Sequence, residues 1–261
     1  MISCILTLCS LLHIESSFAP FLSHHLIATL VQMWSSVENF FLEKSELPSH
    51  FPLETIKTIQ TSNVYELGKL ISLRFIEWVI ENPTGVVALP TGRTPEFFIK
   101  TLENYKRNWS DEAIQQEVKL SGLSISATFP DTSRLHFVML DEFFPMRSSH
   151  RNSFCRYIRT YYIELLEIPP QNVLTFDFIE EGLLTEQDLL LFDAPDVDIT
   201  LLEREPKNVQ ELAQKEVLEN VRDYCVLYEQ RIQDMGGISF FLGGIGPGTV
   251  CLVNLTWYNL T

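Results

Sequence analysis

Basic residues are scarce in this 261-residue chain, and their scarcity limits the partners it can have. The sequence holds 19 Lys and Arg against 34 Asp and Glu, which gives a formal net charge of −15. Nucleic acids and anionic membrane surfaces attract proteins through a positive field. We therefore expect no nucleic acid and no membrane as partner. A small phosphate held by local backbone dipoles is compatible with this charge.

Cysteine is also sparse. The chain has five cysteines, an odd number, and no two of them are spaced as Cys-x-x-Cys. This pattern predicts neither a disulfide framework nor a zinc site. We expect no bound metal, and a reducing compartment, the cytoplasm, as the location.

The N-terminus lacks the features of a membrane span or a secretory signal. The apolar stretch Ile2–Leu12 is too short to cross a bilayer. Ser17-Phe18-Ala19 resembles a cleavage site, but the first basic residue is Lys44, whereas secretory signals begin with a basic region. Whether residues 1–20 form a targeting segment stays open.

The chain as a whole has the composition of a folded protein, with 46% apolar and 20% charged residues. Apolar periodicity predicts helices and strands in alternation, which is typical of an α/β fold with a mostly parallel sheet. The expected helices cover residues 24–45, 63–82, 95–106, 152–168 and 206–235, and the expected strands cover 86–89, 135–143, 172–176 and 238–242. Two stretches are expected to be surface excursions: 108–134, and the acidic, solvated segment 177–205.

The turn after the first predicted strand is the clearest candidate for binding. Residues Thr91-Gly92-Arg93-Thr94 follow an apolar strand and precede a helix, for which Thr94 is the expected N-cap and Pro95 the first residue. Free backbone N–H groups and two hydroxyls at such a turn can hold a phosphate. The alternative is an ordinary strand-to-helix turn. The sequence is neither a Walker A loop nor a dinucleotide fingerprint.

Two further strand ends carry distinctive residues. Asp141 and Glu142 end the second predicted strand, and Gly243, Gly244 and Gly246 follow the fourth. The carboxyl ends of parallel strands share one edge of a sheet, so one cleft can use all three turns. The two carboxylates either perform acid–base chemistry or cap the following turn, and the residues alone leave both readings open.

Taken together, three motifs resemble the glucosamine-6-phosphate isomerase/deaminase family, to which the 6-phosphogluconolactonases are related. They are Leu89-Pro90-Thr91-Gly92-Arg93-Thr94-Pro95, Leu140-Asp141-Glu142-Phe143 and Phe241-Leu242-Gly243-Gly244-Ile245-Gly246-Pro247. The resemblance covers roughly residues 50–248. It implies a Rossmann-like three-layer α/β/α sandwich, a sugar phosphate as ligand, no cofactor and possible homo-oligomers.

The resemblance also implies roles. The substrate phosphate would lie on Thr91, Gly92, Arg93 and Thr94. Asp141, with Glu142 beside it, would move the proton next to the carbonyl carbon, and Gly243, Gly244 and Gly246 would line the cleft. The implied organisation is an extension with an amphipathic helix over 1–50 and a sugar-phosphate domain over 51–261. That domain would contain an acidic insertion at 177–205 and a divergent tail at 248–261.

The tail departs from the family pattern. Where the family continues with Asp-Gly-His and a later glutamate, this chain has Gly248, Val250 and Leu255, and it stops at Thr261. The resemblance therefore implies impaired ring opening and a sheet incomplete at its C-terminus. A frameshift or truncated reading of a longer enzyme, a non-catalytic sugar-phosphate binding module and a lactonase-like hydrolase are the alternatives.

Overall fold

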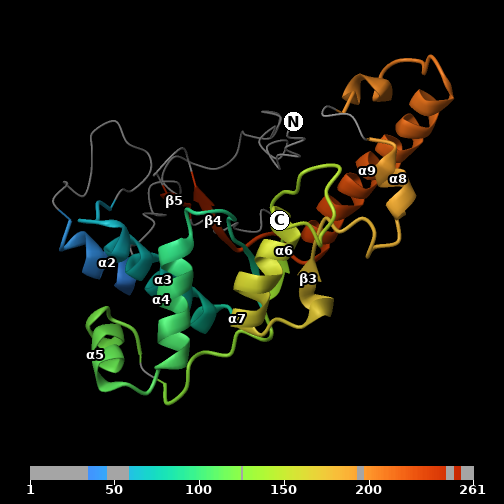
Figure 1. The fold of residues 1–261 in the computed structure, drawn as a ribbon. Coiled ribbons are helices and arrows are strands. Elements are labelled where there is room, and N and C mark those ends of the chain that lie inside the picture. Colours follow the sequence, from blue (N-terminus) through green and yellow to red (C-terminus); the bar gives the residue numbers. More distant parts are fainter. Residues whose placement is uncertain (1–34, 46–58, 125, 193–196, 245–249, 254–261) are drawn as a thin grey trace, which may run out of the picture. The chain divides into compact units, whose positions relative to one another are not determined.

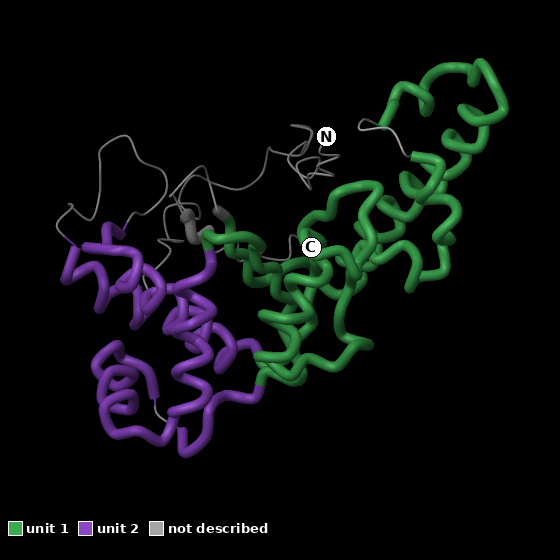
Figure 2. Tube along the Cα trace, viewed as in Figure 1, with its two compact units in different colours: residues 1–7, 83–94, 132–261 green, residues 8–82, 95–131 purple. Residues whose placement is uncertain are grey.

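The computed structural model describes residues 35–45, 59–124, 126–192, 197–244 and 250–253. The chain divides into two compact units, which are coloured separately in Figure 2. Unit 1 contains residues 83–94 and 132–261, together with 1–7, and unit 2 contains residues 8–82 and 95–131. Each unit is described by itself.

Unit 1 is built on a five-stranded sheet with the order β3-β2-β1-β4-β5 (Figure 1). Strand β1 pairs in parallel with β2 and with β4, β2 pairs in parallel with β3, and β5 runs antiparallel to β4. Four parallel strands with helices between them in the chain confirm the predicted α/β, Rossmann-like fold. The strands are Val86–Ala88, His136–Val138, Val173–Leu174, Phe240–Gly244 and Val250–Val253, for β1 to β5.

Strands β1, β2 and β3 are shorter than predicted, β4 is shifted by two residues, and β5 was not predicted. The stretch 135–143 was expected to be a single strand, but β2 ends at Val138, so Asp141 and Glu142 lie beyond it in a loop. Strand β5 falls within the tail that the sequence marked only as divergent. Gly243 and Gly244 belong to β4 itself rather than to the turn after it.

The helices of unit 1 pack on the sheet through tyrosines. Helix α6 (Phe154–Ile158) continues through a π-helical turn (Arg159–Ile163) into α7 (Glu164–Leu166). Tyr162, in the π-helical turn, stacks on Phe137 of β2 with ring centroids 5.8 Å apart. From the long helix α9 (Val209–Asp234), Tyr228 donates a hydrogen bond to the Met139 carbonyl at 2.7 Å. In the described residues no helix is long and apolar enough to span a bilayer.

The structure buries only part of the face that apolar spacing predicts for α9, which consists of Val209, Leu212, Val217, Val221, Cys225, Tyr228 and Ile232. Val217, Val221 and Tyr228 are buried as expected, but Val209 is 84% exposed and Leu212 is 46% exposed. The first turns of α9 therefore extend beyond the core, although their apolar spacing is that of a buried helix face.

The acidic segment 177–205 has more structure than the sequence indicates. It contains α8 (Glu186–Leu190) and a 3-10 turn (Ile199–Leu202), and several of its apolar side chains are buried. These are Phe178, Leu184, Leu189, Phe192, Val197 and Leu201. Charge composition predicts a solvated excursion in which the run Leu189-Leu190-Leu191-Phe192 packs locally. Leu189 and Phe192 of that run are buried, and the other buried residues were not expected.

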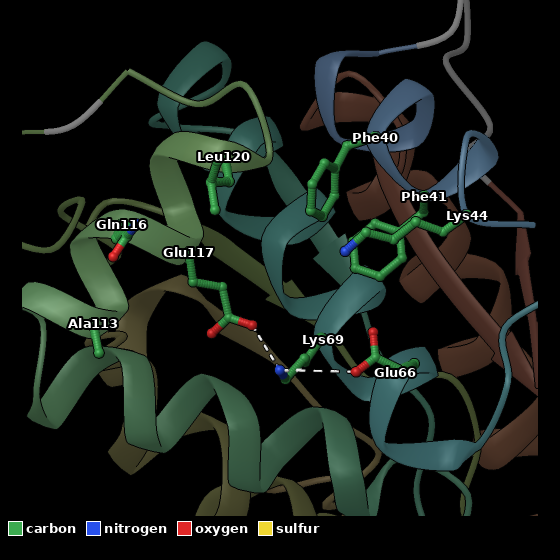
Figure 3. A pocket seen from close by; sticks show the side chains of 9 residues that line it. All are labelled: Phe40, Phe41, Lys44, Glu66, Lys69, Ala113, Gln116, Glu117 and Leu120. Atoms are coloured by element: carbon green, nitrogen blue, oxygen red, sulfur yellow. Dashed lines mark ion pairs between the residues drawn. The ribbon is translucent and has the colours of Figure 1, made fainter.

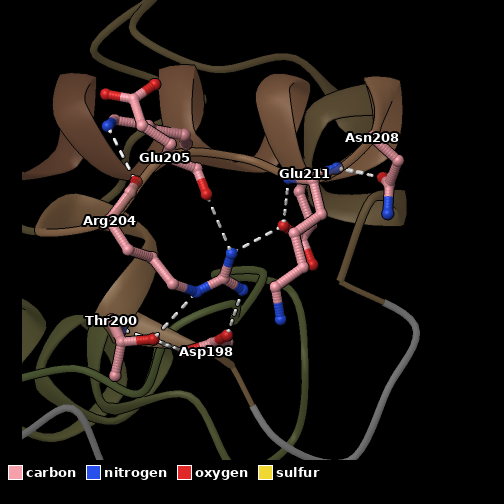
Figure 4. A network of polar contacts seen from close by, with 8 residues as sticks. Asp198, Thr200, Arg204, Glu205, Asn208 and Glu211 are labelled. Carbon is pink, nitrogen blue, oxygen red and sulfur yellow. Dashed lines mark hydrogen bonds and ion pairs between the residues drawn. The ribbon is translucent and has the colours of Figure 1, made fainter.

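Arg204 is one of the side chains that join this segment to α9 (Figure 4). The Arg204 guanidinium contacts Asp198 at 2.8 Å and Glu211 at 2.7 Å. Hydrogen bonds from Thr200 and then from Arg204 hold the pKa of Asp198 down at about 2. The network therefore keeps its charges over the whole neutral and mildly acidic range.

In its described residues, unit 2 contains the helices α2 (Ser36–Leu42), α3 (Val64–Glu81), α4 (Glu96–Arg107) and α5 (Glu112–Leu120). Helix α3 is capped by Asn63, one of the two residues, Ser62 and Asn63, that the sequence offers as its cap. Helix α5 was missed, since residues 108–134 were expected to be irregular. Asp111 caps it, and Ile114 and Val118 are buried. Of the helix predicted over 24–45, residues 24–34 lie outside the described residues.

Buried charges fasten α2 to α3. The Glu77 carboxylate accepts hydrogen bonds from the backbone N–H groups of Ser36 at 3.0 Å and Val37 at 3.4 Å, which start α2. Arg74 lies 3.5 Å from Glu77 and 3.3 Å from Glu38 of α2. Arg74 and Glu77 are each only 7% exposed, so each depends on the other for compensation of its charge.

We expect Glu77→Ala to lower the free energy of unfolding by about 3 kcal/mol, since it leaves the buried Arg74 with Glu38 alone and removes the acceptor of the N–H groups that start α2. Chemical denaturation followed by circular dichroism measures the change. Glu103→Ala, which removes an exposed i,i+4 pair with Arg107, is the control and should change stability little. Equal effects of the two substitutions would contradict this account.

We expect Arg204→Ala to free the 3-10 turn from α9. Protease cleavage within residues 197–208 should become several-fold faster than in the parent, while cleavage rates at other sites should stay the same. Limited proteolysis with mass spectrometry locates the cuts. Arg222→Ala is the matched control, because Arg222 is an exposed arginine of α9 that pairs only with its neighbour Asp223 among the pairs described. Unchanged cleavage in Arg204→Ala would show that the network does not hold the segment.

Candidate active site

The strand order predicts where unit 1 binds ligands. Strand β1 has β2 on one side and β4 on the other. From β1 the chain adds β2 and β3 on one side and then returns to add β4 on the other side, so the strand order switches between β1 and β4. Open α/β sheets bind ligands outside the carboxyl ends of the strands at this switch point. The loop Thr91–Thr94 follows β1, and Asp141 and Glu142 follow β2, its neighbour. Gly243 and Gly244 form the carboxyl end of β4, while Gly246 lies outside the described residues.

The loop after β1 has the backbone shape that its glycine permits. Gly92 has φ +86°, and a Cβ built there would meet nothing within 4 Å. The constraint is therefore conformational rather than steric crowding. Arg93 is exposed, while Thr91 and Thr94 are half-buried. Thr94 is not the N-cap that the sequence predicted, because α4 begins one residue later, at Glu96, with Pro95 in the cap position.

Two tyrosines hold this loop from the side of α6. The hydroxyl of Tyr162 donates to the Pro90 carbonyl at 2.6 Å, and the hydroxyl of Tyr157 donates to the Gly92 carbonyl at 2.8 Å. Sequence reasoning placed Tyr157 on the buried face of a helix and did not assign Tyr162 at all. The spacing of aromatic residues gave no sign that their hydroxyls reach the loop.

Glu142 is fully engaged by the start of α6. One carboxylate oxygen accepts from the backbone N–H groups of Phe143 at 3.0 Å and Phe154 at 3.1 Å. The other accepts from the Ser153 hydroxyl at 2.7 Å and the Cys155 N–H at 2.9 Å. A carboxylate at a helix N-terminus is favoured by the unpaired N–H groups and by the helix dipole. Of the two readings that the sequence left open, these contacts favour capping for Glu142.

Asp141 has a different environment. It is half-buried, and no hydrogen bond to its carboxylate is described among the residues that the structure covers. Burial raises the pKa of Asp141, and the negative charge of Glu142 raises it further. A carboxylate with a raised pKa is a better proton acceptor once ionised, which suits a general base.

Nothing in the described part of the chain forms a metal centre, that is, a group of three or more His, Cys, Asp or Glu side chains able to hold an ion. Cys155, beside Glu142, is buried, and burial raises the pKa of its thiol to about 12. Since the thiolate is the nucleophile, Cys155 is inert at neutral pH.

Two open cavities lie elsewhere. One, of about 340 Å³, is in unit 2, among residues from the α2 region, α3 and α5, where Lys69 contacts Glu117 at 2.7 Å and Glu66 at 3.8 Å (Figure 3). The other, of about 430 Å³, is in unit 1 near the start of β2 and β3, lined by His136 and Arg231 among others. The candidate site therefore rests on strand topology and side-chain contacts rather than on cavity size.

No family model matches the chain. Glucosamine-6-phosphate deaminases of Clostridium perfringens are similar to it: those of strains 13 and ATCC 13124 are each 25% identical over 191 residues, covering 73% of this chain and 55% of the relative. The deaminase of strain SM101 is 24% identical over the same length. The chain thus spans about half the length of the curated relatives it matches. A solved structure of a monomeric glucosamine-6-phosphate deaminase is 17% identical with a TM-score of 0.46, covering 75% of this chain and 58% of that one.

The contacts of Asp141 and Glu142 predict opposite effects on stability. Glu142→Gln should lower the free energy of unfolding by about 2 kcal/mol, because an amide turns two N–H donors toward the N–H groups of α6. Asp141→Asn should leave stability unchanged or raise it at pH 7. The raised pKa means that the folded state disfavours the charge, so the cost is absent below the unfolded pKa and grows as pH rises through the folded pKa.

Denaturant unfolding of both variants at pH 4 and pH 7 measures this difference. Glu164→Gln, at an exposed position of α7, is the control for the loss of one negative charge. A destabilised Asp141→Asn, or a Glu142→Gln as stable as the parent, would contradict the assigned environments.

Proposed function

We propose that unit 1 carries a sugar-phosphate site of the glucosamine-6-phosphate deaminase/isomerase type. The observation that carries the proposal is the pairing of two turns through α6: Glu142, next to Asp141, caps this helix, and Tyr157 of the same helix binds the loop at Gly92. The similarity to deaminases of C. perfringens over 73% of the chain supports the same function.

In this proposal the loop Thr91–Thr94 holds the phosphate of glucosamine 6-phosphate. Backbone N–H groups and two hydroxyls surround the dianion, and the exposed Arg93 supplies a positive charge. Such local donors and the charge of Arg93 are necessary, because the net charge of −15 gives the protein an overall field that repels a phosphate.

Asp141 is proposed to move the proton. Conversion of an aldose to a ketose needs one base that removes the proton beside the carbonyl carbon and returns it to the neighbouring carbon. In the 2-amino sugar, the resulting ketose imine loses ammonia when water adds. Glu142 is a positioning residue in this account, since both of its oxygens already accept hydrogen bonds from α6 and its flanking residues.

Ring opening is the step for which this chain has least support. The resemblance gives the position of a histidine to Val250, and the structure places Val250 in β5, opposite Gly244 of β4. Gly248 and Leu255, the other two departures, lie outside the described residues. Without a general acid–base for ring opening, that step is slower by about 10²–10⁴-fold. We therefore propose binding of the sugar phosphate with weak turnover.

Thermal unfolding with added ligand tests the proposal. Glucosamine 6-phosphate should raise the midpoint, while glucosamine without phosphate should not, because binding to the folded state alone stabilises it. Ammonia release, measured in the same samples, should be slow and should be lost in Asp141→Asn, which still binds.

Gly92→Ala tests the loop directly. Alanine at φ +86° strains the turn, so the phosphate-dependent shift should disappear. Gly182→Ala is the matched control: Gly182 has φ +71° and equally open surroundings, but lies in the acidic segment. A midpoint that responds equally to both sugars, or not at all, would overturn the proposed site.

A further inference from the structure

The two tyrosine contacts fall on alternate carbonyl groups of the loop. Tyr162 binds the carbonyl of Pro90 and Tyr157 binds the carbonyl of Gly92, both from the helical segment 154–166. All four residues belong to unit 1. Two hydroxyl donors thus turn two carbonyl groups of the loop toward the same helical segment.

Peptide geometry then fixes where two N–H groups point. In a trans peptide the C=O and the N–H of one unit point in opposite directions. The Pro90 carbonyl shares its peptide with the N–H of Thr91, and the Gly92 carbonyl shares its peptide with the N–H of Arg93. Both N–H groups must therefore point away from the tyrosines. Neither donates to an acceptor within the residues that the structure describes.

We propose that Tyr157 and Tyr162 are positioning residues, which aim the N–H groups of Thr91 and Arg93 together at a bound phosphate; this inference rests on the proposed function of the loop. Successive N–H groups around a left-handed residue form a concave anion seat, and Gly92 supplies the left-handed residue. The tyrosines also keep two carbonyl oxygens, which would repel the anion, turned away from it.

The two tyrosines differ in how rigidly their side chains are held. Tyr162 is fully buried and stacked on Phe137, and burial raises its pKa well above the usual value, so its hydroxyl stays a donor at any working pH. Tyr157 is half-buried, with its ring 4.6 Å from that of Tyr161. Tyr157→Phe removes the hydroxyl without a large core defect and is therefore the sharper test.

The first experiment needs no ligand. Hydrogen–deuterium exchange of the peptide covering residues 89–95 should be several-fold faster in Tyr157→Phe than in the parent, because the Gly92 peptide is free to rotate. Tyr161→Phe is the matched control: it makes the same change on the same helical segment, at a side chain that is 47% exposed. Equal exchange in the parent and Tyr157→Phe would overturn the positioning role.

The second experiment adds inorganic phosphate. Titration followed by amide NMR should shift the Thr91 and Arg93 signals of the parent most, and Tyr157→Phe should weaken binding about three- to tenfold, the value of one orienting hydrogen bond. Tyr162→Phe should weaken it at least as much, and Tyr161→Phe should not weaken it.

The outcomes separate the two proposals. If the parent does not bind phosphate, the proposed function of the loop fails, and the exchange data alone decide whether the tyrosines hold it. If phosphate binds but Tyr157→Phe binds equally well and exchanges equally slowly, the positioning role fails and the phosphate site stands. Shifts confined to amides other than Thr91 and Arg93 would overturn the assignment of the two donors.

Discussion

The arrangement of the candidate site depends on one buried carboxylate. Glu142 is 9% exposed and accepts four hydrogen bonds: one from the N–H of Phe143, its neighbour in the chain, and three from Ser153, Phe154 and Cys155 at the start of α6. The negative charge is tolerated because most of these bonds are made at a helix N-terminus, where N–H groups have no partners within the helix. The direction of α6, and with it the reach of Tyr157, follows from this attachment.

Two adjacent acids thus have different environments. Both carboxylate oxygens of Glu142 accept hydrogen bonds, and its negative charge lies next to Asp141 in the chain. Burial and that charge together raise the pKa of Asp141. Glu142 thus both caps α6 and contributes to the raised pKa of its neighbour.

The sequence predicted most of what depends on local patterns. The α/β alternation, the cap at Asn63 and the cap at Ser153 were all readable, because apolar period and capping residues act within a few positions. The order of the strands, the pairing of β5 and the tie between Tyr157 and Gly92 were not readable. These contacts join residues far apart in the chain, 65 positions in the last case, and no short-range pattern encodes them.

The same limit explains the wrong expectations. Residues 108–134 look polar, yet Ile114 and Val118 of α5 are buried. The segment 177–205 looks solvated, yet several of its apolar side chains are buried, and Phe178 and Phe192 pack against Phe144. In both cases the expectation rested on the average polarity of the whole segment. A few apolar residues within each segment are buried, and they determine its structure.

The π-helical turn at Arg159–Ile163 has a geometric consequence for the two tyrosines. Residues five apart in a regular α-helix are turned about 140° from each other, because five residues make about 1.4 turns. A wider turn takes one more residue per revolution and brings positions 157 and 162 back toward a common side. Removal of one residue between them would leave the tyrosines four positions apart in an ordinary helix, about 40° from each other. The wider turn therefore compensates for the five-residue spacing, and both phenols of one helical segment can reach the loop.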